Sequence, residues 1–336
     1  MAVSSIREIS LGRDRGFPIV SEASYARARS TFIEGLIGFC ARRAHASRLY
    51  LEIGRCVSTA AVLGLHAGLE DKNRATWPTL SRLHAALGDF RFISRNRLDS
   101  YVAYLERYGF IEKRRSSGDR RVTLITPTER LILLDAAFLG ILEAAVRVSE
   151  DREIEPEARG PRPAHHLAIR REMMRHLGLL HRAARRHRKM TIFLERDSGC
   201  LILFLLLQAA EGSEGLDTSL RYDLGAEIAS VSRTHVRMLI EDAERAGLLT
   251  ILEPGGRHIR LSPRLWQATD VWLRDSLSFY RACERRALAA RGRRETAGGI
   301  ATTAGSEGDD DAPVDDATPL GRCRSAPYVS VMGTRP

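Results

Sequence analysis

The chain has 336 residues, 44% of them hydrophobic, and a formal net charge of +10. This length accommodates two ordinary domains with buried cores, and the basic balance favours a polyanionic partner, most often nucleic acid. The longest apolar run, residues 200–210, is much shorter than the roughly 18 residues of a membrane helix, so no transmembrane segment is expected.

The cysteines and histidines indicate neither disulfides nor a metal centre. The five cysteines are widely spaced and form no C-x-x-C pair, which is typical of reduced thiols in the cytoplasm. The ten histidines lack the spacing of a defined zinc site, and the sequence contains no nucleophile elbow or phosphate loop. We therefore expect a cytoplasmic protein without a metal, a cofactor or an enzymatic activity.

The first half of the sequence predicts an N-terminal arm at residues 1–23 and a domain at residues 24–155. The pattern of residues 24–68 is helical. After a loop, Thr79 is placed to cap a short helix, and Ser94 is placed to cap a second helix that ends near Gly109.

A basic hairpin follows this second helix. Two extended runs flank the turn at residues 116–119, Ser-Ser-Gly-Asp. Thr126 and Pro127 are then expected to open a long helix that reaches residue 150, with the threonine as N-cap and the proline at the first position.

The second half follows a linker at residues 156–164, which is rich in Pro, Gly and charge. A basic helix over residues 165–189 and an apolar helix near Leu201 begin a second domain at residues 165–290. Residues 291–336 have little to bury and are expected to be a disordered tail.

An internal repeat relates the two halves at an offset of 138 residues. Residues 232–249 align without gaps on residues 94–111, with identical Ser, Arg, Glu, Arg and Gly at five positions. Further on, residues 261–263 are matched with residues 125–127, which makes the second hairpin two residues shorter. Such a repeat indicates two copies of one structural unit.

Helical periodicity predicts one buried and one exposed face on the second helix of each copy. The buried stripes are Leu98, Tyr101, Val102 and Leu105 in the first copy and Val236, Leu239, Ile240 and Ala243 in the second. The exposed faces and the hairpins carry side chains suited to base edges and phosphates. The candidate DNA-binding residues are Ser94, Arg95, Asn96, Arg97, Ser100, Arg114, Arg115, Arg120, Arg121, Ser232, Arg233, Thr234, His235, Arg237, Arg257 and His258.

At these residues the chain resembles the winged helix-turn-helix regulators, and its first copy resembles the MarR (multiple antibiotic resistance regulator) family. The family's wing reads Asp-x-Arg, then an apolar residue and Leu-Thr-x-x-Gly. Asp119, Arg121 and Thr126 match this pattern, whereas Ile125 replaces the leucine and Glu129 the glycine. The resemblance implies that the aspartate steadies the wing and that the arginine reaches a minor groove.

The resemblance also implies a mainly α fold with two tandem winged helix-turn-helix domains, each with a small two-stranded wing. Residues 24–68, 128–150, 165–190 and 264–290 would form a helical body, as an internal pseudo-dimer or in a homodimer. The second copy departs further from the family, because it has no wing aspartate and Ser262 replaces the threonine. Since the two exposed faces differ, the preferred DNA site should be asymmetric.

Three functions remain open. The first is a bacterial-type transcriptional regulator, with repression expected, that binds double-stranded DNA sequence-specifically and responds to an unidentified small-molecule effector. The second is a plasmid replication initiator with two winged helices. The third is a winged-helix protein-interaction or chromosome-associated module, which would expose apolar side chains on these helices; Met238 is the one such residue.

Overall fold

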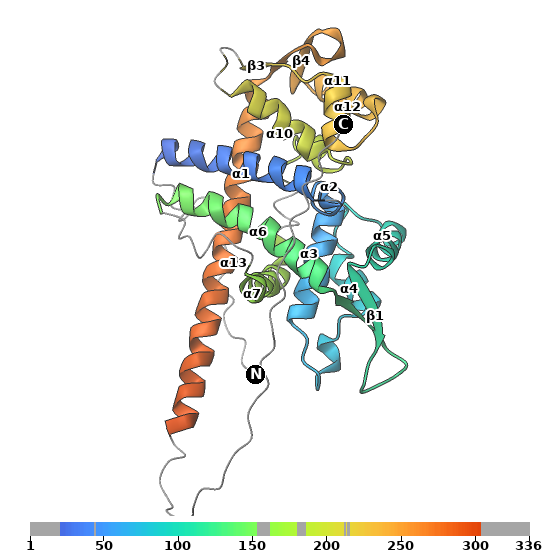
Figure 1. The fold of residues 1–336 in the computed structure, drawn as a ribbon, viewed down its shortest axis with the longest axis vertical. Helices are drawn as coiled ribbons and strands as arrows, with labels where there is room; N and C mark the ends of the chain where they lie inside the picture. The colour runs from blue at the N-terminus through green and yellow to red at the C-terminus, as the bar shows by residue number, and fades with distance from the viewer. Residues whose placement is uncertain are drawn as a thin grey trace, which may run out of the picture. The chain divides into compact units, whose positions relative to one another are not determined.

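The computed structural model describes residues 21–303 except residues 44, 153–161, 180–185, 212 and 214–215, with side chains as far as residue 293. Over this range the protein is mainly helical, with two small antiparallel sheets (Figure 1). No described helix is both long enough and apolar enough to cross a membrane. Contacts divide the chain into two units, residues 1–291 and residues 292–336.

The described part of the first half contains two helices of 21 residues, several shorter helices and one hairpin. The region predicted as helical over residues 24–68 consists of three helices, because His45 takes a φ of +68° and Glu52 is extended at the N-cap of the third. The elements are α1 (Glu22–Arg42), α2 (Ala46–Tyr50), α3 (Ile53–Ala67), the 3-10 turn η1 (Arg74–Thr76), α4 (Leu80–Leu87), α5 (Arg95–Arg107), β1 (Ile111–Arg115), β2 (Thr123–Pro127) and α6 (Glu129–Ser149).

The second half repeats part of this order. The elements are α7 (Pro163–Arg175), α9 (Thr191–Leu194), α10 (Gly199–Ala210), β3 (Asp217–Thr218), α11 (Tyr222–Ala229), α12 (Arg233–Arg245), β4 (Leu249–Glu253), the 3-10 turn η4 (Pro254–Gly256), β5 (His258–Leu261) and α13 (Pro263–Thr303). Helix α7 ends at Arg175 and residues 177–179 are again helical, whereas residues 180–185 of the basic helix predicted over residues 165–189 lie outside the described residues. Helix α13 continues into the segment predicted as disordered, whose residues 304–336 lie outside the described residues, as does most of the predicted linker.

The predicted repeat is confirmed from the serine caps to the start of each hairpin. Ser94 and Ser232 are extended, and each hydroxyl accepts a hydrogen bond from the amide three residues later, at 3.3 Å and 3.1 Å. Helices α5 and α12 then occupy equivalent residues, and the glycines that follow them, Gly109 and Gly247, have φ of +68° and +66°. We call α4, α5, β1 and β2 the first head, and β3, α11, α12, β4 and β5 the second head.

The hairpin registers correct the predicted alignment beyond this point. Ile111 pairs with Pro127 in the first hairpin, and Leu249 pairs with Leu261 in the second. Pro127 therefore corresponds to Leu261, and the second hairpin is shorter by four residues rather than by two.

Helix α6 begins later than predicted. Thr126 lies within β2 and does not cap the helix, because pairing with β1 continues to Pro127 and Thr128 occupies the N-cap position. The Thr128 hydroxyl donates to the carbonyls of Gly109 and Phe110, at 2.8 Å and 3.1 Å, rather than accepting from the helix. This residue therefore fastens the start of α6 to the start of the hairpin.

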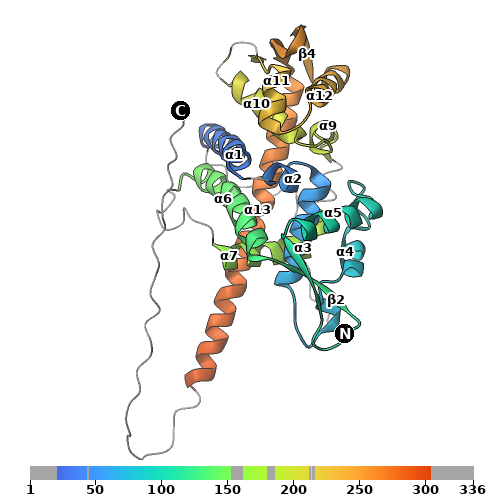
Figure 2. The same ribbon diagram turned by 45° about the vertical axis from the view of Figure 1, so that its right-hand side comes forward.

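Helices from both halves pack together within the first unit. Helix α1 lies along α6 (Figure 1; Figure 2) and also contacts α10. The Phe32 ring of α1 meets Phe204 of α10 and Trp272 of α13 edge-on, with ring centroids 5.6 Å and 6.3 Å apart. The Tyr25 hydroxyl donates to the carbonyl of Asp270 at 3.1 Å. Helix α1 thus joins the first half of the chain to helices of the second.

A buried ion pair holds α7 against α6. The Arg170 Nε and Nη2 atoms donate to Asp135 at 3.0 Å and 2.7 Å, and the Tyr50 hydroxyl donates to the same carboxylate at 3.1 Å. The arginine and aspartate side chains are 5% and 3% exposed. Burial alone would lower the pKa of Arg170, but the Asp135 carboxylate raises it above its usual value. Each partner therefore depends on the other for compensation of its charge.

We expect Asp135→Ala to lower the free energy of unfolding by about 3–5 kcal/mol, because it leaves a buried guanidinium without an anion. Urea denaturation of the full chain measures this loss. The control is Arg27→Ala, which breaks an exposed pair with Asp151 and should cost about 1 kcal/mol or less. Equal effects of the two substitutions would contradict the role given to the buried pair.

Candidate nucleic-acid interface

Helix α5 presents polar side chains because its opposite face is buried. All eight residues of the predicted stripes in α5 and α12 are buried, with exposed fractions of 5% or less, which confirms both periodicities. Arg95, Asn96 and Ser100 are exposed on α5. The N-terminal half of the helix therefore offers a guanidinium, an amide and a hydroxyl to solvent.

Arg97 is held at the edge of this surface. Its Nη2 atom lies 3.5 Å from Glu52 Oε2, and its Nη1 atom donates to the carbonyl of Phe92 at 3.4 Å. Glu52 is 1% exposed, and its carboxylate accepts from the amides of Gly54 and Arg55 at the start of α3. Burial raises the pKa of this carboxyl above its usual value. The contacts tether Arg97 while its side chain stays 54% exposed.

The first hairpin is fixed by η1 rather than only by its own strands. Asp119 accepts from the Arg121 amide at 3.0 Å and from Arg74 Nη2 at 2.5 Å. The Arg74 guanidinium also lies over the Trp77 ring, 5.4 Å from its centroid, and a Cβ at Gly118 would be 3.4 Å from the same ring. The turn that carries the wing arginines is therefore anchored to the preceding segment.

The tip of this hairpin carries cations without anionic partners. Arg120 and Arg121 are exposed, and within the described part of the chain neither side chain makes an ion pair. By contrast, Arg114 donates to Glu112, with its Nε at 2.7 Å, and Arg115 donates to a backbone carbonyl at 3.5 Å. The two tip arginines are thus the most available cations of the hairpin.

A basic groove runs beside α5. A pocket of about 410 Å³ borders the helix at Asn96, Arg97 and Ser100, and it shares Arg48 and Arg55 with a second pocket of about 490 Å³. We call the two pockets together the basic groove. Arg55 pairs with the Asp197 carboxylate at the far side of the groove. Arg48 instead lies over the Tyr104 ring.

The basic groove extends to the second head. Its far part is lined by Arg42 at the end of α1, by Arg43 and His45 in the connection to α2, and by Ser230 and Val231 shortly before α12. The sequence did not identify these arginines as candidates, because they lie outside the repeat. Their only signal is a concentration of basic residues between positions 42 and 55.

The two heads differ in charge. Residues 77–128 contain ten Arg and Lys against five Asp and Glu, whereas residues 217–262 contain six against seven. Only the first head therefore carries an excess of positive charge.

The cations of the second hairpin are neutralised locally. Arg260 donates to both oxygens of Asp217, at 2.6 Å and 3.0 Å, and His258 contacts the same carboxylate at 3.1 Å. The hydrogen bonds from Arg260, followed by that from His258, lower the pKa of Asp217 to about 2. Arg257 lies 3.8 Å from Glu253. This hairpin consequently presents less free positive charge than the first.

The candidate residues on α12 are also partly engaged. His235 Nε2 contacts the carbonyl of Asp197 at 2.9 Å, and Arg237 pairs with Glu241 at 3.4 Å. Ser232, Arg233 and Thr234 are exposed at the start of the helix. The second head therefore keeps a short polar surface at one end of α12.

Apolar side chains are exposed on the second head. Leu224, Ile228, Met238 and Leu252 are 48%, 38%, 47% and 40% exposed. Leu224 and Ile228 are one helical turn apart and share a face of α11. The sequence had singled out only Met238 for this property.

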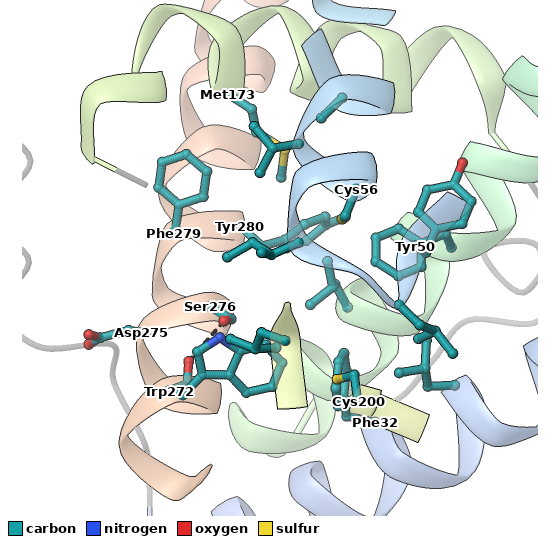
Figure 3. A pocket seen from close by; sticks show the side chains of 18 of the residues that line it. Phe32, Tyr50, Cys56, Met173, Cys200, Trp272, Asp275, Ser276, Phe279 and Tyr280 are labelled. Carbon is teal, nitrogen blue, oxygen red and sulfur yellow. Dashed lines mark hydrogen bonds between the residues drawn. The ribbon is translucent and has the colours of Figure 1, made fainter. Parts of the chain in front are cut away.

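The helical body contains an apolar cavity of about 200 Å³ (Figure 3). Figure 3 shows that Phe32, Tyr50 and Trp272 contribute rings to its wall. Asp275 lies at its polar edge, where its carboxylate contacts His187 Nε2 at 3.0 Å. An apolar cavity of this size can hold a molecule about as large as benzene.

Comparisons of the chain with protein-family models, with curated proteins and with solved structures find no match.

Two adjacent glycines in the turn of the second hairpin, Gly255 and Gly256, differ in how closely the chain packs around them. Gly256 has a φ of +76° and accepts a hydrogen bond from the Leu220 amide at 2.9 Å; a Cβ there would lie 2.0 Å from the Leu220 carbonyl oxygen. Gly255 has a φ of +78° but open space around it. Both alanine variants should lose roughly 1 kcal/mol for the left-handed backbone. Gly256→Ala should lose about 1–3 kcal/mol more through overpacking.

Urea denaturation compares the two variants, and hydrogen exchange at the Leu220 amide reports the local contact. Equal destabilisation, with unchanged exchange at Leu220, would contradict the close approach of the hairpin to the start of α11.

Proposed function

We propose that the protein is a sequence-specific double-stranded DNA-binding transcriptional regulator that contacts DNA chiefly through its first head. The observation that carries the proposal is the combination of an exposed polar face on α5 with an anchored basic hairpin. The tip arginines of that hairpin and Arg95 make no ion pair among the described residues. Side chains left without anions are the ones that can neutralise phosphates and release counterions.

The chemistry of α5 fits the major groove. Asn96 can bind an adenine bidentately, and Arg95 or Arg97 can bind a guanine. The hairpin arginines, Arg120 and Arg121, can follow the phosphate backbone or enter a minor groove. The arginines of the basic groove extend the positive surface beyond the head and add phosphate contacts that carry no sequence information.

The order of elements supports the tandem winged-helix interpretation. In each half a buried helix, α3 or α10, precedes two short helices and an antiparallel hairpin, and a long helix follows. On this proposal the chain is a MarR-like cytoplasmic regulator in which the helical body acts as an internal pseudo-dimer. A repressor of this kind would bind its effector in the apolar cavity of that body.

The surface of the second head favours a role other than DNA binding. Its balanced charge and its exposed leucine, isoleucine and methionine side chains suit a protein partner better than a polyanion. We infer that the winged-helix interaction function, left open by the sequence, applies to this head. A replication initiator that binds DNA with both heads would need a second head as basic as the first, and the second head lacks this excess of positive charge.

The double variant Arg120→Ala/Arg121→Ala tests the first head. We expect weaker binding to all DNA sequences and a reduction of about two in the slope of log affinity against log salt, because two phosphate contacts are lost. Fluorescence anisotropy with the full chain and duplexes from a binding selection measures both quantities. The matched control is Arg257→Ala/His258→Ala on the second hairpin, which should change the slope by less. Equal effects of the two double variants would contradict an unequal use of the heads.

Asn96→Ala tests base recognition. We expect the variant to lose about 1–3 kcal/mol of discrimination at one or two adjacent positions, without a uniform loss of affinity. Thr234→Ala, at the corresponding position of α12, should leave the selected sequence unchanged. Sequencing of the DNA retained by each variant in a binding selection gives the result. A palindromic optimum, or one altered equally by both variants, would show that both heads read bases.

A further inference from the structure

A buried cluster of ionisable side chains lies where α6 meets α7. One ligand atom from each of Glu143, His165 and His166 lies within 4.8 Å of the others. The side chains of these residues are 5%, 14% and 2% exposed. The spacing of the histidines did not predict a metal site, because the carboxylate comes from the preceding helix, 23 residues before His166, and only the packing of α7 against α6 brings it close.

Arginines orient the Glu143 carboxylate. Its Oε1 atom accepts from Arg147 Nη2 at 3.0 Å and also from Arg162, while its Oε2 atom lies 3.4 Å from His166 Nε2. Burial raises the pKa of this group, but the hydrogen bonds from His166, Arg162 and Arg147 together lower it to about 2. The carboxylate is therefore held at one oxygen by two guanidinium groups, with its other oxygen directed toward a histidine.

A second carboxylate has a similar arrangement. Glu284 of α13 accepts from Arg281 Nη1 at its Oε2 atom, at 2.5 Å, and its Oε1 atom lies 3.8 Å from His165 Nε2. Its side chain is 7% exposed. Each histidine thus faces one carboxylate oxygen, while the other oxygen of that carboxylate is held by a guanidinium.

Four buried polar atoms around this cluster have no hydrogen-bond partner among the described residues. They are Arg162 Nε, His165 Nε2, His166 Nδ1 and the Tyr280 hydroxyl. Buried polar atoms in folded proteins nearly always have a partner, and each exception needs an explanation. The unpartnered histidine nitrogens beside two carboxylates are consistent with a further species bound there.

We propose that Glu143, His165 and His166 bind one divalent transition-metal ion, with zinc as the reference ion. Two imidazole nitrogens and one carboxylate oxygen are a donor set that zinc accepts at about 2.0–2.2 Å. The fourth position is open to water or to Glu284. Three guanidinium groups, those of Arg147, Arg162 and Arg281, oppose the ion electrostatically, and three carboxylates face them, because Glu150 also accepts from Arg281. Groups that hold the free oxygen of a ligand commonly orient it.

Such an ion would tie α6 to α7, and through Glu284 to α13. Because the ligands come together only in the folded chain, binding stabilises the native state and raises the unfolding temperature. The inference does not depend on DNA binding, since none of these residues belongs to the first head or to the basic groove.

The test is metal binding by the full chain after dialysis against a chelator. We expect one Zn²⁺ per chain in competition with a chromophoric chelator, and a higher unfolding temperature when Zn²⁺ is added. Co²⁺ should give the visible absorption of a tetrahedral site without a thiolate charge-transfer band. His166→Gln and Glu143→Gln should each weaken binding at least tenfold, whereas His176→Gln, at the end of α7 and outside the cluster, should bind as the wild type does.

Circular dichroism of the metal-free variants establishes that they are folded. If a ligand variant does not fold, the change in the imidazole NMR signals of His165 and His166 when Zn²⁺ is added to the wild-type chain decides the question. Absence of stoichiometric binding, unchanged imidazole signals, a thiolate band, or wild-type affinity in the folded ligand variants would each overturn the proposal.

Discussion

Burial of one face of α5 is the constraint on which the proposed interface depends. Leu98, Tyr101, Val102 and Leu105 are all nearly inaccessible, so the helix has a single permitted rotation. The serine cap fixes where the helix starts, and the glycine after it, in a left-handed conformation, fixes where the chain turns into the hairpin. Together these features decide which polar groups face solvent and how far the wing stands from them.

The same local constraints act on α12, yet the two heads present different surfaces. Burial and capping fix the direction of each helix, but they do not restrict which residue types occupy its exposed positions. In the second head, exposed positions hold carboxylates that pair with the cations, as Asp217 pairs with Arg260. Other exposed positions hold apolar side chains such as Leu224 and Ile228. A duplicated unit can therefore keep one architecture while one copy remains basic and the other becomes suited to a different kind of partner.

Features that depend on neighbouring residues could be predicted from the sequence, whereas contacts between distant residues could not. The caps at Thr79 and Ser94, the buried stripes and the repeat depend on residues within one or two helical turns, so periodicity and capping chemistry identified them. The start of α6 was misplaced because strand pairing, a contact across the hairpin, outweighed the local preference of Thr126 and Pro127 for a helix N-terminus. The basic groove and the cluster around Glu143 were missed for the same reason: their members come together only through packing of separate helices.

The salt dependence of DNA binding by the wild-type chain tests the central claim most directly. If the first head and the basic groove neutralise about five phosphates, the slope of log affinity against log salt should be about −4 to −5. Anisotropy titrations of one duplex over a range of salt concentrations give this slope. A slope near zero, or no binding at low ionic strength, would contradict the account and leave the two heads as surfaces for protein partners.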